Sequence, residues 1–133
     1  MSTSLNTTKP VPIAEHQQIV KVVQDHYIEG LRIGDWNTIS GAFHKEATMY
    51  GWTAIDGPLL GGPISNLKGY LDQYGPAPNM KSRIDIIGIT PTSAVVKVDL
   101  EDDAGGFDYT DFHTLLRTDG EWEIISKVFH KYD

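Results

Sequence analysis

Helical and extended patterns occupy different parts of this sequence, with Pro78 near the boundary. Before Pro78, apolar residues recur mostly at intervals of three to four, which is typical of amphipathic helices. After it, apolar and polar residues alternate in runs that short turns separate, which is typical of half-buried strands. Because the helices come first and the strands follow, we predict an α+β fold rather than an α/β fold with a parallel sheet.

The predicted elements are three helices and five strands in one domain. The helices cover residues 13–34, 35–43 and 65–74, and the strands cover 47–52, 81–89, 94–101, 107–117 and 121–132, with a loop at 57–63. Residues 1–12 lack apolar periodicity, and we expect a flexible tail there. Residues 13–133 are expected to form a single domain, since a chain of 133 residues fits one compact core.

The composition excludes several classes of function. The absence of cysteine rules out disulfides, a thiol nucleophile and thiolate metal sites. A net charge of −7, from 18 acidic and 11 Lys and Arg residues, argues against nucleic acid or an anionic membrane as partner. No apolar run approaches the roughly 18 residues that span a bilayer, and no secretory signal pattern is present, so a cytoplasmic protein is expected. Motifs for metals and phosphates are missing as well, and we expect no metal and no cofactor.

The last predicted hairpin assigns its residues to two faces. A three-residue turn at 118–120 places Arg117 opposite Glu121. It also places Asp111 opposite Lys127, so both pairs join opposite charges, whereas a two-residue turn pairs Asp111 less well. The predicted core face carries Phe112, Thr114, Leu116, Trp122, Ile124, Ser126, Val128 and His130. The other face carries Asp111, His113, Leu115, Arg117, Glu121, Glu123, Ile125, Lys127 and Phe129. This second face mixes charged and apolar residues, which favours a subunit interface.

Three motifs together resemble the nuclear transport factor 2-like superfamily. They are Tyr27-Ile28-Glu29-Gly30-Leu31-Arg32-x-Gly34-Asp35, Phe43-His44-x-x-Ala47, and a long run from Asp111 to His130 that contains Asp119-Gly120-x-Trp122. Over residues 13–131, the chain is most similar to the branch named "Putative lumazine-binding". The resemblance implies a cone in which a curved antiparallel sheet wraps around three N-terminal helices, with an internal pocket. It also implies a homodimer packed sheet to sheet.

Ketosteroid isomerase belongs to the same superfamily and allows a test of one activity. The resemblance places its oxyanion-hole tyrosine at Tyr27 and its catalytic base at Gly51, which has no side chain. Its protonated aspartic acid falls near Phe112, or at Asp111 if the hairpin slips by one residue. Because that isomerase starts its reaction with a carboxylate base, we expect no steroid-type isomerisation here.

Tyrosine, histidine and other aromatic side chains are the remaining candidates for a site. Tyr27 ranks first because its position and the resemblance agree. His130 on the predicted core face must bond a neighbour or face a cavity. The predicted pocket-lining residues are Tyr27, His130, Phe112, Ser126, His26, Met49 and Trp52. The predicted dimer-interface residues are Asp111, His113, Leu115, Ile125, Lys127 and Phe129.

Three functions are compatible with these observations. The first is a homodimeric protein that binds a small apolar or aromatic molecule in an aromatic pocket. The second is an enzyme of the polyketide cyclase, dehydratase or isomerase kind, with His130 or His26 as base and Tyr27 as proton donor, since histidine titrates near neutral pH. The third is a structural module that recruits a partner protein through its sheet.

Overall fold

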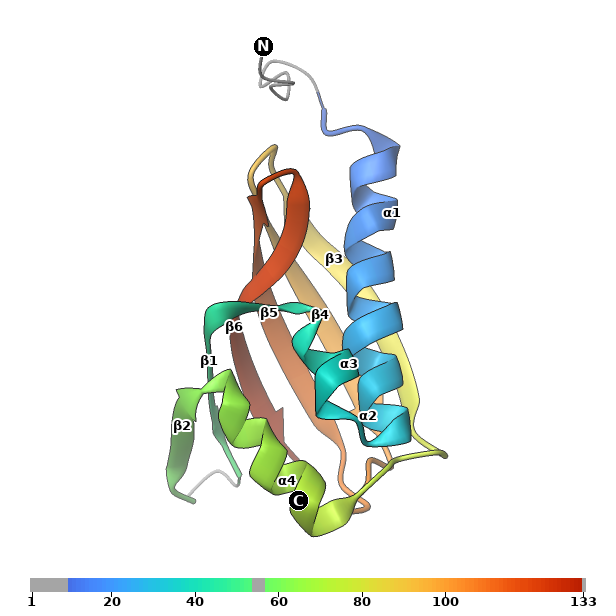
Figure 1. Cartoon of the computed structure of the whole chain (residues 1–133), viewed down its shortest axis with the longest axis vertical. Coiled ribbons are helices and arrows are strands. Elements are labelled where there is room, and N and C mark those ends of the chain that lie inside the picture. The colour runs from blue at the N-terminus through green and yellow to red at the C-terminus, as the bar shows by residue number, and fades with distance from the viewer. Residues whose placement is uncertain (1–9, 54–56, 133) are drawn as a thin grey trace.

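A six-stranded sheet with helices on one face forms the protein (Figure 1). The computed structural model describes residues 10–53 and 57–132. The strand order is β2-β1-β6-β5-β4-β3, and every pair of neighbours is antiparallel except β1 and β6, which are parallel. The predicted α+β class with a mostly antiparallel sheet is confirmed.

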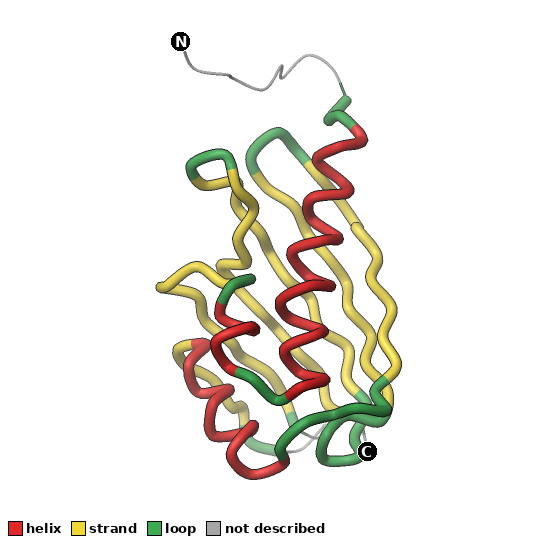
Figure 2. Tube along the Cα trace, turned by 45° about the vertical axis from the view of Figure 1, so that its right-hand side comes forward, coloured by secondary structure: helices red, strands yellow, loops and turns green. Residues whose placement is uncertain are grey.

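The helices and strands follow one another in the predicted order, and the structure adds the strand Leu59–Pro63. They are α1 (Ile13–Val22), η1 (Val23–Ile28), α2 (Glu29–Ile33), α3 (Trp36–Ser40), β1 (Phe43–Trp52), β2 (Leu59–Pro63), η2 (Ile64–Asn66), α4 (Leu67–Tyr74), β3 (Lys81–Ile89), β4 (Ser93–Glu101), β5 (Tyr109–Thr118) and β6 (Glu121–Lys131). The tube in Figure 2 shows the long first helix and the shorter helices on one side of the strands. The expected tail at 1–12 lies outside the described residues as far as residue 9.

The first helix runs from Ile13 to Ile33 as one unit, and its middle segment η1 has π-helical hydrogen bonding. It ends at Gly34, whose left-handed backbone (φ 70°) closes the last turn. Asp35 then caps α3, because its carboxylate accepts hydrogen bonds from the backbone N–H and the hydroxyl of Thr38 at 3.2 and 2.6 Å. The Gly-Asp pair therefore separates two helices, as the sequence predicted.

The predicted loop at 57–63 is wrong from Leu59 onward. Leu59–Pro63 forms strand β2, which pairs antiparallel with β1. Gly61 lies opposite Tyr50, and the ring of Tyr50 occupies the space where a side chain at position 61 would lie. Gly61 allows close packing against Tyr50 and does not mark a turn. The prediction missed the strand because it took the glycines of this segment as signs of a loop.

The turn of the last hairpin differs from the prediction. Thr118 pairs with Glu121, so Asp119 and Gly120 form a two-residue turn. Both turn residues have positive φ, 50° and 81°, as the type I′ turn favoured by Asp-Gly requires. The preference of Asp-Gly for this turn outweighed the cross-strand charge pairs on which the three-residue prediction rested.

A β-bulge shifts the same hairpin a second time. The residue pairs change from Leu115–Ile124 to Thr114–Ser126, which leaves Ile125 without an opposite residue. Beyond the bulge, every pair is therefore displaced by two residues from the predicted register. Asp111 lies opposite Phe129 instead of Lys127.

The predicted assignment of the two hairpin faces is wrong along β5 and along β6 beyond the bulge. The predicted interface residues Asp111, His113, Leu115, Lys127 and Phe129 are buried on the inner face, and Ile125 is half-buried at the bulge. The predicted core residues Phe112, Thr114, Leu116 and Val128 are exposed, while Trp122 and Ile124 are buried as expected. The two-residue turn shifts the pairing by one residue, which turns the odd-numbered residues of β5 to the face of Trp122 and Ile124. The bulge at Ile125 then turns the odd-numbered residues of β6 beyond it to the same face.

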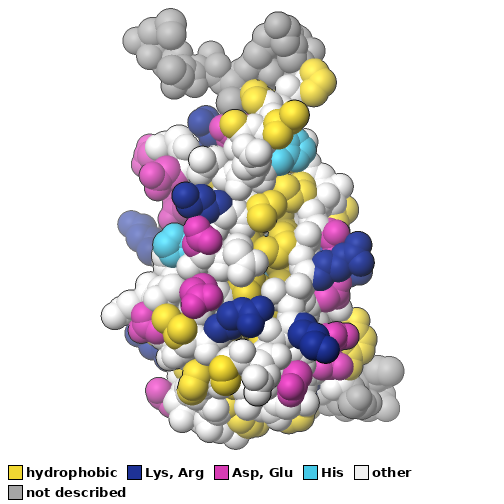
Figure 3. Space-filling model, turned by 90° about the vertical axis from the view of Figure 1, so that its right-hand side faces the viewer, with side chains coloured by type: hydrophobic (Ala, Val, Ile, Leu, Met, Phe, Trp, Pro, Cys, Tyr) yellow, Lys and Arg dark blue, Asp and Glu magenta, His cyan; other side chains and the backbone are white. Residues whose placement is uncertain are grey.

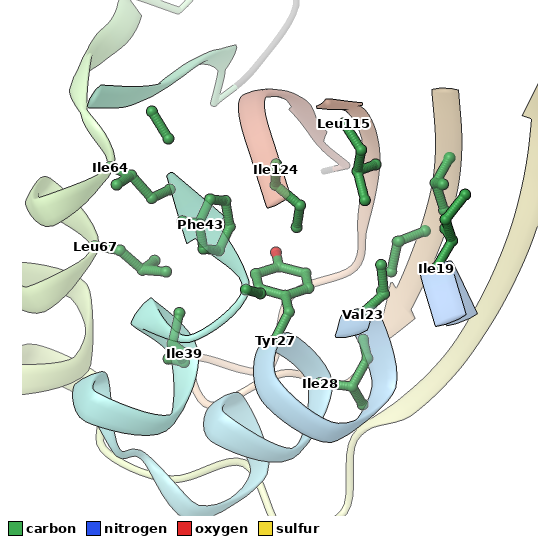
Figure 4. Close-up of a cluster of buried hydrophobic side chains, with 14 of the residues drawn as sticks. Ile19, Val23, Tyr27, Ile28, Ile39, Phe43, Ile64, Leu67, Leu115 and Ile124 are labelled. Atoms are coloured by element: carbon green, nitrogen blue, oxygen red, sulfur yellow. The ribbon is translucent and has the colours of Figure 1, made fainter. Parts of the chain in front are cut away.

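The core lies between the first helix, α3, α4 and the inner face of the sheet. Figure 4 shows Tyr27 reaching from the first helix toward the sheet, among Phe43, Ile124 and Val23. Charged side chains of both signs lie on the surface (Figure 3), on the side formed by α1 and β3. No helix in the described part of the chain is long and apolar enough to cross a membrane.

Candidate functional site

A cavity of about 440 Å³ lies between α4 and the inner face of the sheet. Such a volume is within the range of roughly 300–1,000 Å³ found for small-molecule sites. Its wall is mostly apolar and aromatic, with residues Leu31, Met49, Leu67, Tyr70, Leu71, Tyr74, Ala77, Met80, Leu100, Phe107, Tyr109 and Phe129. The charged members of the wall are Asp103, Asp111, Lys127 and Lys131, and Tyr27 adds a hydroxyl.

At the inner end of the cavity, Tyr27 and Asp111 form a hydrogen-bonded pair. The hydroxyl of Tyr27 donates to Oδ2 of Asp111 at 2.5 Å. His113 lies two residues further along β5, on the same face, and its Nε2 is 3.3 Å from the same oxygen. All three side chains are buried. The other carboxylate oxygen, Oδ1 of Asp111, has no hydrogen-bond partner among the residues that the structure describes.

Tyr27 owes its position to the π-helical segment of the first helix. Single π-helical turns within α-helices occur frequently at functional sites, since they re-aim the side chains on that turn. The ring of Tyr27 meets the rings of His113 and Phe43 edge to face, at centroid distances of 4.9 and 5.7 Å. This packing holds the hydroxyl at the sheet rather than in solvent.

Lys127 lies beside this pair on β6, directly opposite His113. Its Nζ is 5.3 Å from the ring centroids of both Tyr27 and Phe129. The four ion pairs found among the described residues do not include Lys127. A buried amine thus lines the cavity between two aromatic rings.

Burial and mutual charge set the protonation states of this group. Burial by itself would raise the pKa of Asp111, but the charge of Lys127 and the hydrogen bonds from His113 and Tyr27 outweigh it and hold the pKa below its usual range. Burial lowers the pKa of His113 and of Lys127, and Asp111 opposes both shifts in part. Burial and the charge of Asp111 raise the pKa of Tyr27. At neutral pH the site therefore combines an ionised carboxylate, a neutral imidazole and a protonated phenol.

A second polar cluster lies in the same cavity wall, around Asp103. The hydroxyl of Tyr70 donates to Oδ2 of Asp103, and the hydroxyl of Tyr109 donates to that of Tyr70 at 3.2 Å. The backbone N–H groups of Gly105 and Phe107 donate to Oδ1 at 3.0 and 2.9 Å. Burial raises the pKa of Tyr70, and it raises the pKa of Tyr109 to about 12. The tyrosines remain protonated, and Asp103 holds the loop between β4 and β5 against α4.

The structure divides the predicted pocket residues into two groups. Tyr27 and Met49 lie in the cavity wall. The remaining five lie elsewhere, since His26 is exposed on the first helix, Phe112 and Trp52 are exposed, and Ser126 and His130 are half-buried on the outer face. His130 and Tyr27 are therefore on opposite sides of the sheet, and the predicted His130 or His26 base does not reach the cavity.

Asp111, His113 and Lys127 were assigned to an interface because the hairpin register was wrong. The signal that could have found Asp111 and His113 is the Asp119-Gly120 turn, whose preferred two-residue form places both on the face of Trp122 and Ile124. Lys127 reaches that face only through the bulge. The turn slips by one residue from the favoured register, and Asp111 contacts Tyr27. The pKa of Asp111 is lowered, however, so Asp111 is not the protonated acid of the isomerase comparison.

Position 51 has no room for a catalytic carboxylate. A side chain there would collide with the backbone oxygen and the ring of Phe129. Gly51 is thus a packing requirement of the β1–β6 pair. Among residues 10–53 and 57–132, no group of three or more His, Asp or Glu side chains is arranged to hold a metal ion.

Comparison with known proteins identifies the family. The model of the family described as "Putative lumazine-binding" matches residues 14–130. The chain belongs to this family. Its nuclear transport factor 2-like fold is shared by solved proteins, described as of unknown function, from Shewanella baltica OS155 (35% identity, 94% of this chain and 99% of that one, TM-score 0.80) and Methylobacillus flagellatus KT (34%, 92% and 96%, 0.83). Aldolase FrzH from Cladobotryum sp. is 40% identical over 106 residues, 80% of this chain and 83% of that protein. The predicted family and fold are confirmed.

Proposed function

We propose that this family member is an enzyme that makes or breaks a carbon–carbon bond beside a carbonyl group, in an aldol-type reaction within the cavity. The observation that carries the proposal is the buried group of Tyr27, Asp111 and Lys127 in the cavity wall. The 40% identity to a protein named an aldolase supports the same class of reaction.

An aldol reaction needs a base that removes a proton next to a carbonyl and donors that stabilise the resulting oxyanion. Asp111 supplies the base, because it is ionised and its Oδ1 accepts no hydrogen bond from the described residues. Lys127 activates the carbonyl group, and Tyr27 donates and takes back a proton. His113 does not line the cavity, so it is a positioning residue that fixes Asp111 through Oδ2.

The apolar and aromatic lining also favours a second function, the binding of a small aromatic molecule without turnover. Catalytic turnover distinguishes the aldol function from binding alone. A fluorogenic aryl β-hydroxyketone, which releases a naphthaldehyde on retro-aldol cleavage, is incubated with the protein and with Asp111→Asn. We expect the variant to cleave it about 100-fold more slowly or worse, the usual contribution of a general base.

The control for this assay is Asp72→Asn, an exposed residue of α4. This variant should cleave at the wild-type rate. Tight binding of aromatic ketones with no cleavage by the wild type would favour the binding function instead.

For assembly, we propose a homodimer through the outer face of the sheet. Tyr50, Val128 and Phe112 are neighbours across β1, β6 and β5, and each is 45–49% exposed. Val95, Leu116 and Trp52 extend this outer patch. Apolar surface of this kind is typical of subunit interfaces.

The cytoplasmic location stays a prediction from the sequence.

A further inference from the structure

Two lysines line the cavity, and their surroundings differ. Lys131 is half-buried and its Nζ lies 3.6 Å from the ring centroid of Phe107. Lys127 is only 7% exposed and lies between the rings of Tyr27 and Phe129. Lys127 is thus the amine that the protein has withdrawn from water.

Neutralising the charge of Asp111 does not by itself explain why the amine of Lys127 is buried in the cavity wall. The carboxylate of Asp111 already accepts from Tyr27 and lies within reach of His113, both at Oδ2. The ion pairs of the described residues include no contact of Lys127 with it within 4.0 Å. A lysine that only neutralised Asp111 would gain most by direct contact, since the attraction falls with distance.

We infer that Lys127 is the catalytic nucleophile of the site and forms an imine with the carbonyl carbon of the substrate. The inference rests on the proposed aldol function and names its covalent step. An amine attacks only in its neutral form, and desolvation in an apolar pocket is the established way to obtain one. The lowered pKa of Lys127 agrees with this role, even though the charges of Asp111 and Asp103 oppose the shift.

The step balances without an oxidant or a reductant. The Nζ lone pair attacks the carbonyl carbon, and the oxygen receives one proton from Nζ and one from the Tyr27 hydroxyl and leaves as water, which gives a protonated imine; Tyr27 regains its proton when the imine is hydrolysed. Asp111 Oδ1 then removes a proton from the adjacent carbon, and the electron pair forms an enamine. The enamine carbon bonds to an aldehyde carbon, whose oxygen takes the proton from Asp111. Water finally hydrolyses the imine, releases the product and restores the amine.

The cavity also indicates the class of substrate. Tyr70, Tyr74 and Phe107 form an aromatic wall, with ring centroids 4.7 Å (Tyr70–Tyr74) and 6.1 Å (Tyr74–Phe107) apart. Such rings favour stacking or edge contacts with another ring. The structure therefore favours an aryl-substituted ketone or aldehyde that carries a hydrogen beside its carbonyl group.

Reductive trapping tests the inference directly. The protein is incubated near neutral pH with 4-phenyl-2-butanone and sodium cyanoborohydride, which reduces an imine to a stable amine. Intact-mass and peptide mass spectrometry then locate the adduct. We expect one adduct per chain, on Lys127, with Lys131 and the exposed lysines unmodified.

Two variants complete the experiment. Lys127→Arg keeps the positive charge but forms no imine, and it should lose both the adduct and the cleavage of the aryl β-hydroxyketone. Lys21→Met, at an exposed lysine of α1 outside the cavity, should keep both. If Lys127→Arg does not fold, as judged by circular dichroism, reductive trapping on the wild-type protein still shows whether Lys127 forms the imine.

The outcomes separate this inference from the proposed function. Cleavage that depends on Asp111 without an adduct on Lys127 would overturn the imine and leave the aldol function. An adduct on Lys127 without any cleavage would support the nucleophile and contradict the aldol function. Equal labelling of Lys127 and Lys131 would overturn the inference, as would full activity of Lys127→Arg.

Discussion

The contact between Tyr27 and Asp111 joins residues 84 positions apart in the chain, and it brings a phenol and a carboxylate together out of water. The sequence could predict Tyr27 because its helix and the family resemblance agree on its position. It left the partner of Tyr27 open, since the face that Asp111 occupies depends on the turn of the last hairpin.

Removing the Tyr27 hydroxyl should cost stability as well as activity. Tyr27→Phe leaves the buried Oδ2 of Asp111 without its short hydrogen bond, so we expect the free energy of unfolding to fall by about 1–3 kcal/mol. Urea unfolding followed by circular dichroism measures the change. Tyr50→Phe, at an exposed tyrosine, should shift it by less than about 0.5 kcal/mol. Equal effects of the two variants would mean that the pair with Asp111 does not stabilise the fold.

The buried imidazole of His113 leads to a prediction about how the stability of the protein depends on pH. Burial lowers the pKa of His113 in the folded protein, so below the usual histidine pKa the unfolded chain binds a proton that the folded chain does not. Stability therefore rises with pH across this window and is lost as pH falls toward 5. Urea unfolding between pH 7 and pH 5 should show this loss in the wild type and a smaller one in His113→Asn. His26→Gln, at an exposed histidine, should keep the wild-type slope. A wild-type slope in His113→Asn would contradict the assignment.

At the scale of elements, the sequence predicted most of the fold. Helical periodicity before Pro78 and alternation after it were sufficient for the class, and the Gly34-Asp35 break was sufficient for the first two helices. The strand β2 was missed because its glycines and prolines are typical of loops. The faces of β5 and β6 were missed because charge pairing is worth less than the geometry of the turn, and because nothing in the sequence marks the bulge at Ile125.

The close packing of β1 on β6 gives a test at Gly51. Gly51→Ala places a methyl group against the backbone oxygen of Phe129, which cannot move aside cheaply. We expect a loss of about 1–3 kcal/mol in the free energy of unfolding, the usual cost of overpacking. Gly69→Ala is the control, because it lies in α4 with open space around it and should stabilise by about 0.5–1 kcal/mol through helix propensity. A Gly51→Ala protein as stable as the wild type would show that the strands can separate there.

At the scale of the whole molecule, the sheet has two different faces. Its inner face carries the core, the cavity and the buried charges, and its outer face carries the outer patch. The interface was predicted on the wrong set of residues, and the exposed apolar set on the opposite face is now the candidate.

The proposed dimer has the outer patch as its interface. We expect Phe112→Glu to convert the protein to a monomer, since it places a charge in the centre of the proposed interface. Size-exclusion chromatography with light scattering measures the mass. Ile33→Glu, at an exposed apolar residue of the first helix, should leave the mass unchanged. A Phe112→Glu protein with the wild-type mass would exclude the outer patch as the interface.

In the proposed function Asp111 removes a proton beside a carbonyl group in the cavity, and hydrogen exchange measures this step alone. In D₂O, proton NMR follows the loss of the α-proton signals of 4-phenyl-2-butanone with the wild-type protein and with Asp111→Asn. We expect the wild type to exchange these protons well above the buffer rate, and the variant to exchange them more slowly by a factor of about 100 or more. Equal exchange with the two proteins would contradict it.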